Sequence, residues 1–304
     1  MAISRAQLVK ELEPGLNALF GLEYKRYENQ HTEIYTTESS DRAFEEEVML
    51  SGFANAEVKA EGSGVSFDEA QETYTARYTH DTIALAFAIT EEAIEDNLYD
   101  RIASRYTKAL ARSMSNAKQV KAVTPLNNGL SSIATFKSGD GVGLFSTNHT
   151  TVSGTAVKNT LTTQADLNET SLEQALIDIS AMTDERGLRV AARGVKMIIP
   201  SANQFNAERL MKSQGRTGTA DNDINAVASM GMIPQGYRVN NFLTDTDSWY
   251  IITDVPNGMK LFQRAALKTA MEGDFDTGNV RYKARERYSF GVSDYRGIFG
   301  VEGA

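Results

Sequence analysis

The order of the first 125 residues constrains the fold most: a long polar segment, then a short strand, then one very long helix. Residues 21–75 carry aromatic and β-branched residues spread thinly between charges. Such a segment cannot bury enough apolar surface on itself to offset the entropy of ordering. Because it is too aromatic for a solvent-exposed tail, we interpret it as an arm that becomes ordered against other copies of the same protein.

Within this arm, residues 33–82 are predicted to form an extended β-hairpin. Glu61-Gly62-Ser63-Gly64 supplies a flexible tip. In the returning limb, an apolar face of Tyr74, Ala76 and Tyr78 alternates with a polar face of Thr75, Arg77 and Thr79. A period of two with one polar side is typical of a β-ribbon lying on a surface.

A core strand and a long helix follow the hairpin. In residues 83–89 bulky side chains alternate with alanines, which predicts a strand with one bulky and one close-packed face. Thr90 is the expected N-cap of a helix over residues 91–121, roughly 45 Å long, which ends at Pro125. Its predicted buried stripe repeats every four residues: Ile94, Leu98, Ile102, Tyr106, Leu110 and Met114.

Two further segments have clear local signals. Residues 4–20 have leucines at helical spacing, but Pro14-Gly15 predicts a break or turn there. The second half alternates strands and helices, which indicates an α/β domain and, with the hairpin, an α+β protein overall. Its predicted elements are loops with short strands over 127–165, helices from the capping boxes Ser171/Gln174 and Ser201/Gln204, a strand at 195–199, a polar loop at 213–223, strands at 237–243 and 249–253, and strand-like residues in the last 25.

The net charge of −9 is unevenly distributed. Residues 1–100 carry 7 basic and 21 acidic side chains, residues 101–121 carry 6 basic and none acidic, and residues 122–304 carry 18 basic and 19 acidic. One interpretation is solubility together with complementarity to the helix dipole. The other is that acidic arms lie over basic patches of neighbouring subunits, in contacts that weaken with salt.

No residue pattern indicates catalysis, a cofactor or a metal. The chain has no cysteine, and His31, His80 and His149 lack partners at metal-ligand spacing. The glycines at 139–143 lack the Lys-Ser/Thr sequel of a phosphate loop. Glu45, Glu46 and Glu47 are interpreted as solvated charges. No apolar run is long enough for a transmembrane helix, and no signal-peptide core is present, so we expect synthesis in the cytoplasm and no membrane contact.

The basic residues near the C-terminus form the strongest candidate for polyanion binding. On one face of the expected strand lie Arg281, Lys283, Arg285 and Arg287. Four charges on one face can contact phosphates, but no aromatic residue shares that face and the chain is acidic overall. An ion-pair surface between subunits, facing acidic arms, is therefore the preferred interpretation.

Taken in order, the arm, hairpin, long helix, α/β domain and returning strand resemble the major capsid proteins of tailed bacteriophages with the Hong Kong ninety-seven fold. Residues 140–149, DGVGLFSTNH, followed by Asn159-Thr160-Leu161 and the helix from Ser171, resemble the "DG…LFS…H" stretch of subunits similar to the Mu head protein. The strand from Val195 to Pro200, the loop at 213–223 and the turn from Asp245 to Trp249 are also similar to that family.

The resemblance implies a domain organisation. Residues 1–35 would form the N-terminal arm, 36–82 the extended hairpin (E-loop), and 83–125 with 276–304 the peripheral domain with its spine helix. Residues 126–275 would form the axial domain, whose 213–223 loop would crowd the centre of a capsomer. Interface candidates are Glu45, Glu46, Glu47, Lys59, Arg77, Arg216, Arg281, Lys283, Arg285 and Arg287.

The resemblance also implies a function and partners. The subunits would form pentamers and hexamers that close into an icosahedral shell around double-stranded DNA, located in the virion and touching the DNA only non-specifically. Since the arm starts near Met1, we expect a separate scaffolding protein, besides a portal protein and, as a further candidate, a cement protein. Some relatives form Lys–Asn isopeptide crosslinks, but no acceptor pattern matches Lys59, so we predict noncovalent assembly. A covalent ladder on a denaturing gel of particles would refute this.

Three alternatives stay open from the sequence. An encapsulin-like nanocompartment shell would share the fold and enclose a cargo enzyme. A soluble α/β enzyme with an acidic regulatory arm would need a convergent polar site, which the sequence does not show. A tail-tube or baseplate protein is disfavoured by the long helix.

Overall fold

A computed structural model describes residues 5–90, 92–93, 99–130, 139–215, 223–274 and 277–304. The described elements, in chain order, are α1 (Arg5–Arg26), η1 (Gln30–Glu33), β1 (Thr36–Ser39), β2 (Phe44–Leu50), β3 (Glu72–Thr79), β4 (Asp81–Ile89), α3 (Tyr99–Asn127), β5 (His149–Thr150), β6 (Ala156–Val157), α4 (Glu169–Ala181), β7 (Gly194–Ile199), η2 (Ser201–Asn203), α5 (Gln204–Lys212), α6 (Ala226–Met230), β8 (Tyr237–Val239), β9 (Trp249–Thr253), β10 (Met259–Gly273), β11 (Val280–Val292), η3 (Tyr295–Gly297) and β12 (Ile298–Val301).

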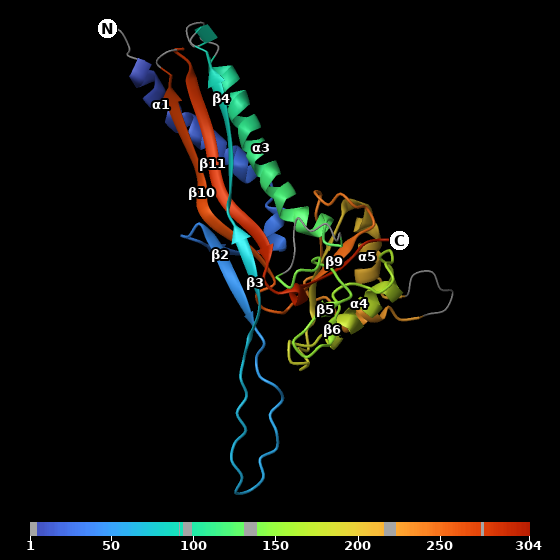
Figure 1. Cartoon of the computed structure of the whole chain (residues 1–304). Coiled ribbons are helices and arrows are strands. Elements are labelled where there is room, and N and C mark those ends of the chain that lie inside the picture. The colour runs from blue at the N-terminus through green and yellow to red at the C-terminus, as the bar shows by residue number, and fades with distance from the viewer. Residues whose placement is uncertain (1–4, 91, 94–98, 131–138, 216–222, 275–276) are drawn as a thin grey trace.

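Two four-stranded sheets organise the molecule. One has the strand order β1-β10-β11-β4 and carries α1 and α3, and the other has the order β12-β9-β7-β8 and packs with α4 and α5 (Figure 1). The β2–β3 hairpin extends from the first sheet and ends in a long loop (Figure 1). Mixed sheets with helices packed on them make this an α+β protein, as expected.

The first sheet is built around β11, whose side chains alternate as its sequence predicts. Tyr282, Ala284 and Glu286 are buried, while the basic residues between them are exposed. The buried face packs on both helices: Asn17 of α1 accepts hydrogen bonds from Thr269 and Tyr282 at 2.7 and 2.8 Å. On the opposite face Arg281, Lys283 and Arg285 are exposed, while Ser289 and Gly291 further along the strand are buried beneath the hairpin.

Strand β10, to which the sequence analysis assigned no element, pairs with β11 over most of its length. Residues 264–272 are rich in alanine and other good helix formers, so local propensity disfavours a strand. Pairing with β11 overrides that propensity. β10 falls within 126–275, assigned above to the axial domain, and β12 falls within the peripheral range 276–304 but pairs with β9. The division into domains therefore stays a proposal.

Strand β4 corrects one expectation. Ala84, Ala86 and Ala88 were predicted to be close-packed, yet all three are exposed. The reason is that β4 is an edge strand and its alanines lie on the uncovered face of the sheet. Its bulkier side chains Ile83 and Phe87 pack towards the helices.

The helix α3 confirms the predicted long helix over residues 99–121 and continues to Asn127, while most of residues 91–98 lie outside the described part of the chain. Pro125 does not end it, since the helix runs two residues further. A proline this close to the end removes only one donor. Two carbonyls in the last turns of α3 accept hydrogen bonds from tyrosine hydroxyls. Tyr35 donates to the Ala122 carbonyl at 2.6 Å, and Tyr250 donates to the Leu126 carbonyl at 3.2 Å.

The buried stripe of α3 differs from the predicted one. Leu110 and Met114 are buried as expected, but Tyr106 is 52% exposed. A strict four-residue repeat drifts about 40° around a helix at every step, so it leaves the buried face. The observed stripe alternates steps of three and four, through Ala103, Thr107, Leu110, Ala111, Met114, Ser115, Lys118, Gln119, Ala122, Val123 and Leu126. Ile94 and Leu98 lie outside the described residues.

The predicted break in the N-terminal helix is wrong, because α1 continues through Pro14. Beyond the proline, Leu16 and Phe20 are buried against α3 and the sheet, and this packing outweighs one lost backbone hydrogen bond. Helix α1 thus covers the sheet rather than forming a free arm.

The hairpin is shorter than predicted. Residues 36–39 form β1, which pairs in parallel with β10 and belongs to the sheet, so the ribbon comprises only β2 and β3. Residues 51–71 between them have no strand pairing, and a turn at Glu61-Gly62 forms the expected tip. Ala76 and Tyr78 are buried and Arg77 is exposed, which confirms the predicted alternation of β3.

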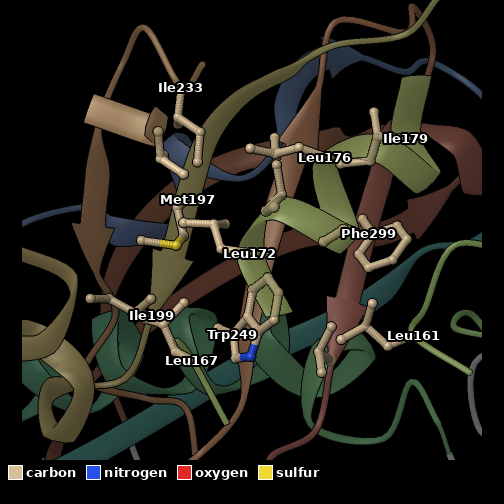
Figure 2. Packing of buried hydrophobic residues seen from close by; sticks show 14 of the residues in the cluster. Leu161, Leu167, Leu172, Leu176, Ile179, Met197, Ile199, Ile233, Trp249 and Phe299 are labelled. Carbon is tan, nitrogen blue, oxygen red and sulfur yellow. The ribbon is translucent and has the colours of Figure 1, made fainter. Parts of the chain in front are cut away.

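The second sheet encloses the largest apolar core. Figure 2 shows Leu172 and Ile179 of α4 beside Trp249 and Phe299, all fully buried. Both predicted capping boxes need correction. Helix α4 begins after Asn168, which caps it, and Ser171 is the third helical residue that bonds back to Asn168. The second helix, α5, follows the short helix η2 and has no side-chain cap. Strand β8 ends at Val239, four residues earlier than predicted.

Protonation of His31 is expected to destabilise this fold. Gln119 Nε2 donates to His31 Nδ1 at 3.0 Å, which requires a neutral ring. Burial, and then the charge of Lys118, lower the pKa of His31 to about 4. An unfolded histidine has a pKa of about 6.5, so between these values only the unfolded chain takes up the proton. Stability is therefore lost as the pH falls from about 6.5 to 4, by about 3 kcal/mol at most.

Urea unfolding of the wild type and of His31→Gln at pH 7 and near pH 4.5 checks this. Burial raises the pKa values of Glu286 and Asp294, and these groups favour the folded state as the pH falls. Because both proteins share them, the difference between the proteins isolates His31. The variant should lose about 2 kcal/mol less than the wild type. Equal losses would contradict this assignment.

Candidate functional site

The base of the hairpin is fixed to the sheet through Glu47 and Lys260. The Lys260 ammonium is buried, donates to Glu47, and lies 3.1 Å from Glu38. Burial lowers the pKa of Lys260, but hydrogen bonds to Glu47 and Glu38 outweigh this and raise it overall. Ser293 donates to Glu47 and also contacts the Tyr78 hydroxyl. Three strands, β1, β2 and β10, thus meet at one cation.

A second polar contact lies beside it. Ser40 Oγ donates to Glu45 at 2.7 Å and contacts His80 Nε2 at 2.9 Å, while His80 Nδ1 lies 2.9 Å from Ser289 Oγ. Burial, followed by the nearby Arg287 charge, lowers the pKa of His80. These contacts hold the two ends of the hairpin against β11.

The acidic residues predicted as interface candidates therefore have partners within the chain. Glu45 and Glu47 make the contacts above, and Glu46 lies 3.6 Å from Arg77 in a solvent-exposed pair. Arg77 also covers the Phe44 ring at 4.1 Å. In the single chain these side chains orient the hairpin, and their role between subunits stays a prediction.

The distal part of the hairpin exposes apolar side chains. Its exposed apolar residues are Leu50, Phe53, Val58, Val65 and Phe67, of which Val58 and Phe67 are almost fully exposed. Isolated exposed apolar side chains are ordinary, but such a row on a narrow ribbon indicates a surface that another molecule covers. Lys59 lies in the same exposed stretch.

One arginine links this distal part to the second sheet's domain. Arg186 donates to the Glu69 carbonyl at 2.6 Å and lies 3.4 Å from Asp68. The backbone N–H of Ala54 donates to Asp68 at 2.7 Å and is the main cause of its lowered pKa. These contacts are solvent-exposed, so they stabilise this hairpin position only weakly.

The uncovered face of the first sheet, which we name the basic sheet face, carries the predicted basic residues. Its exposed members are Ala84, Ala86, Ala88, Lys268, Ala270, Glu272, Arg281, Lys283 and Arg285. Arg287 lies further along β11, is half-buried, and donates to the His80 carbonyl. Arg281 pairs with Asp274. Small alanines flank a central basic column, which consists of Arg281, Lys283 and Arg285 of β11. The face is therefore flat enough for another chain to approach closely. Arg216, the remaining candidate, lies outside the described residues.

The "DG…H" stretch is a structural junction. His149 is fully buried, with Nδ1 2.5 Å from Asp140, Nε2 3.0 Å from Asn159, and its ring stacked on Tyr295 at 3.8 Å. Asn159 donates to the carbonyls of Leu144 and Tyr295 at 2.8 and 3.0 Å. The stretch therefore joins the loops after α3 to the C-terminal strand.

Sequence reasoning missed a buried ion cluster. Arg296 is almost fully buried, lies 2.5 Å from Glu185 and 3.3 Å from Asp294, and donates to the Thr183 carbonyl at 2.9 Å. A second buried pair joins Lys118 of α3 to Glu286 of β11 at 3.2 Å. The only available signal was a charged residue inside each apolar or alternating stretch, which does not identify a partner over 100 residues away.

The described residues contain no catalytic arrangement that we recognise. No group of three or more His, Asp or Glu side chains within them is placed to hold a metal ion. Among the described helices, none combines the length and apolar character needed to cross a bilayer. The features that stand out are surfaces, namely the distal hairpin and the basic sheet face.

Comparison with known proteins decides between the alternatives. A family model described as phage capsid protein matches residues 73–301, from the returning limb of the hairpin to β12. The chain belongs to the phage capsid protein family. It is a capsid protein of the virion shell, not a member of an enzyme family, and the nanocompartment and enzyme alternatives are not favoured. A comparison with curated protein sequences gives no match.

Solved structures confirm the Hong Kong ninety-seven fold of this capsid protein. The procapsid of bacteriophage JBD30 is 14% identical, with a TM-score of 0.55, and the match covers 99% of this chain and 77% of that one. The capsid of Myoviridae phage XM1 is 10% identical, with a TM-score of 0.54 and 89% of each chain covered. The virus-like particle from Pyrococcus furiosus is 10% identical, with a TM-score of 0.55, covering 94% and 98%. At these identities the likeness shows the fold.

Proposed function

We propose that this capsid protein assembles as pentamers and hexamers into an icosahedral shell around double-stranded DNA, and that the distal hairpin of each subunit lies on the basic sheet face of a neighbour. The observation that carries the proposal is the opposite charge of two exposed surfaces. Residues 51–71 carry four acidic and one basic side chain, while the basic sheet face carries four basic and one acidic. The charges are equal and opposite, at −3 and +3.

The contact is suited to assembly because it is weak singly and repeated many times. The hairpin loop has no strand pairing of its own in residues 51–71, so it gains order when it lies on another subunit. Complementary charge orients the approach, and the exposed apolar residues supply burial. Identical contacts around a closed shell then act together.

The domain organisation that we propose follows the sheets. The N-terminal arm comprises residues 1–35, the hairpin comprises β2, β3 and the loop between them, and the peripheral domain comprises β1, β4, α3, β10 and β11. The axial domain comprises the second sheet with α4, α5 and the 213–223 loop, which we place at the capsomer centre. A scaffolding protein, a portal protein and a cement protein are the partners we propose, with synthesis in the host cytoplasm.

Neutralising the basic column is expected to impair assembly without unfolding the subunit. The variant is Arg281→Gln/Lys283→Gln/Arg285→Gln, whose side chains are exposed, so the free energy of unfolding should change by less than about 1 kcal/mol. Light scattering should show a loss of shells of at least about tenfold at moderate salt, because the acidic hairpin loses its counter-charges. A matched control replaces three exposed cations of α3, Arg105, Lys108 and Arg112, by Gln and should still assemble. Equal assembly of both variants and the wild type would contradict the proposed contact.

A further inference from the structure

The exposed side of the helix layer carries a second cationic surface, on the opposite side of the first sheet from the basic sheet face. Side chains of β11 that alternate with the basic column point towards α1 and α3, so these two helices form the other side of the layer (Figure 1). On α3 the exposed cations are Arg105, Lys108 and Arg112. We name them, together with Lys25 of α1, the basic helix face.

Helix geometry aligns these cations. Spacings of three and four residues keep Arg105, Lys108 and Arg112 on one side of α3, over about 10 Å of its length. Residues 101–127 contain no acidic side chain, so nothing on the helix itself neutralises them. Lys25 adds to the same positive field from the exposed last turn of α1.

The other basic residues of α3 contrast with this row. Lys118 is buried against Glu286, and Lys121 pairs with Asp81, so both are used within the fold. Among the described residues, Arg105, Lys108 and Arg112 form no ion pair. Helix stability does not account for all three, because the favourable dipole effect on cations is confined to the last turn, which lies beyond Asn116.

A groove of about 470 Å³ runs between the two helices beside the row. It is lined by Lys108 and Arg112 with the polar side chains of Ser113 and Asn116 on α3, by Glu23 on α1, and by Tyr27 directly after α1. The single acidic group, Glu23, is buried, accepts from the Tyr27 hydroxyl at 3.2 Å and lies 3.6 Å from Arg26. The groove is therefore polar with an excess of positive charge.

We propose that the basic helix face binds the phosphate backbone of double-stranded DNA without sequence preference. This rests on the proposed function, since DNA is the polyanion that such a shell encloses. Long, flexible cations with polar neighbours and little apolar surface are typical of phosphate contacts. The Tyr106 ring, which lies at the same height, packs against Phe87 at 5.8 Å.

In the proposed shell the two cationic surfaces have different partners. The basic sheet face receives the hairpin of a neighbour, so it is covered in the assembly, and the basic helix face is the cationic surface left for the enclosed DNA. The two functions are thus assigned to opposite sides of one sheet–helix layer, and can be separated by substitution.

Fluorescence anisotropy of soluble full-length subunits with a labelled duplex of about 30 base pairs tests this over a series of salt concentrations. Each phosphate that the protein neutralises contributes about −0.9 to the slope of log K against log salt. Loss of three such contacts in Arg105→Gln/Lys108→Gln/Arg112→Gln should therefore make the slope less steep by about 2.7. A slope of that size corresponds to about 40-fold in affinity between 50 and 200 mM salt. The equally charged control, Arg281→Gln/Lys283→Gln/Arg285→Gln, should flatten the slope less, because Arg281 already pairs with Asp274 and lies beside Glu272.

A charge-conserving variant excludes a purely structural effect. Arg105→Lys/Arg112→Lys should bind DNA like the wild type, because a non-specific phosphate contact requires only the charge. An unchanged slope in the helix variant, or an equal loss in the sheet variant, would overturn the proposal. If the helix variant instead lost assembly and kept DNA binding, an acidic protein segment would be the occupant and the proposal would be wrong. Loss of assembly in the sheet variant but not in the helix variant would support the proposed contact between subunits, whatever the result for DNA binding.

Discussion

Deletion of residues 55–70 is expected to give a folded, soluble subunit that forms no stable shells. These residues have no strand pairing, and their side chains are exposed in the single chain, so their removal leaves both sheets and the buried cores intact. The lost contacts of Arg186 with Asp68 and Glu69 are solvent-exposed and weak. Assembly should fail because every contact between a hairpin and a neighbour disappears at once.

Electron microscopy and light scattering report the particles, and circular dichroism with urea unfolding reports the fold. A second variant of unchanged loop length tests whether assembly requires the apolar side chains or only the length of the hairpin. It replaces the exposed apolar residues Val58, Val65 and Phe67 by Ser and should also assemble poorly, because the apolar burial is removed while the loop remains. Particles of normal yield and size from the deletion variant would contradict the proposed role of the hairpin.

Replacing Arg296 by Met is expected to be the most destabilising single substitution considered for this chain. Arg296 is buried between Glu185 and Asp294, and the methionine would leave two carboxylates buried without their cation. Breaking a buried pair from one side costs about 3–5 kcal/mol. Burial raises the pKa of Asp294 even with Arg296 present, which shows how poorly solvated that carboxyl group is.

Urea unfolding of unassembled subunits at neutral pH measures this loss, since assembly would add stability of its own. Arg186→Met is a matched control, because Arg186 lies in the same loop region as Glu185 but pairs with Asp68 at the surface. It should cost less than about 1 kcal/mol. A loss for Arg296→Met as small as that of the control would show that the cluster does not stabilise the fold.

The sequence predicted the elements whose side chains follow a clear period. The alternation of β3 and β11 and the existence of the long helix α3 follow from one face meeting a core, so periodicity predicts them. Strand β10 was missed because its alanine-rich residues favour a helix locally and become a strand only through pairing with β11. Pro14 and Pro125 show the same limit, since tertiary packing keeps helices running through both.

The candidate surfaces were predicted only in part. The basic column of β11 was found because its residues alternate along one strand. The partners of Glu47 and Arg296 lie more than 100 residues away in the chain, at Lys260 and Glu185, and no local pattern encodes such pairs. The exposed cations of α3 were visible as a charged segment, but only the fold separates them from Lys118, which is buried against Glu286.

Negative-stain electron microscopy of the purified protein, with light scattering for size, tests the central claim most directly. We expect closed shells, or rings of five and six subunits, that dissociate as salt rises, because the proposed contact is largely between opposite charges. A uniform monomer at every concentration and salt tested, and also after addition of a scaffolding protein, would contradict self-assembly through the hairpin and the basic sheet face.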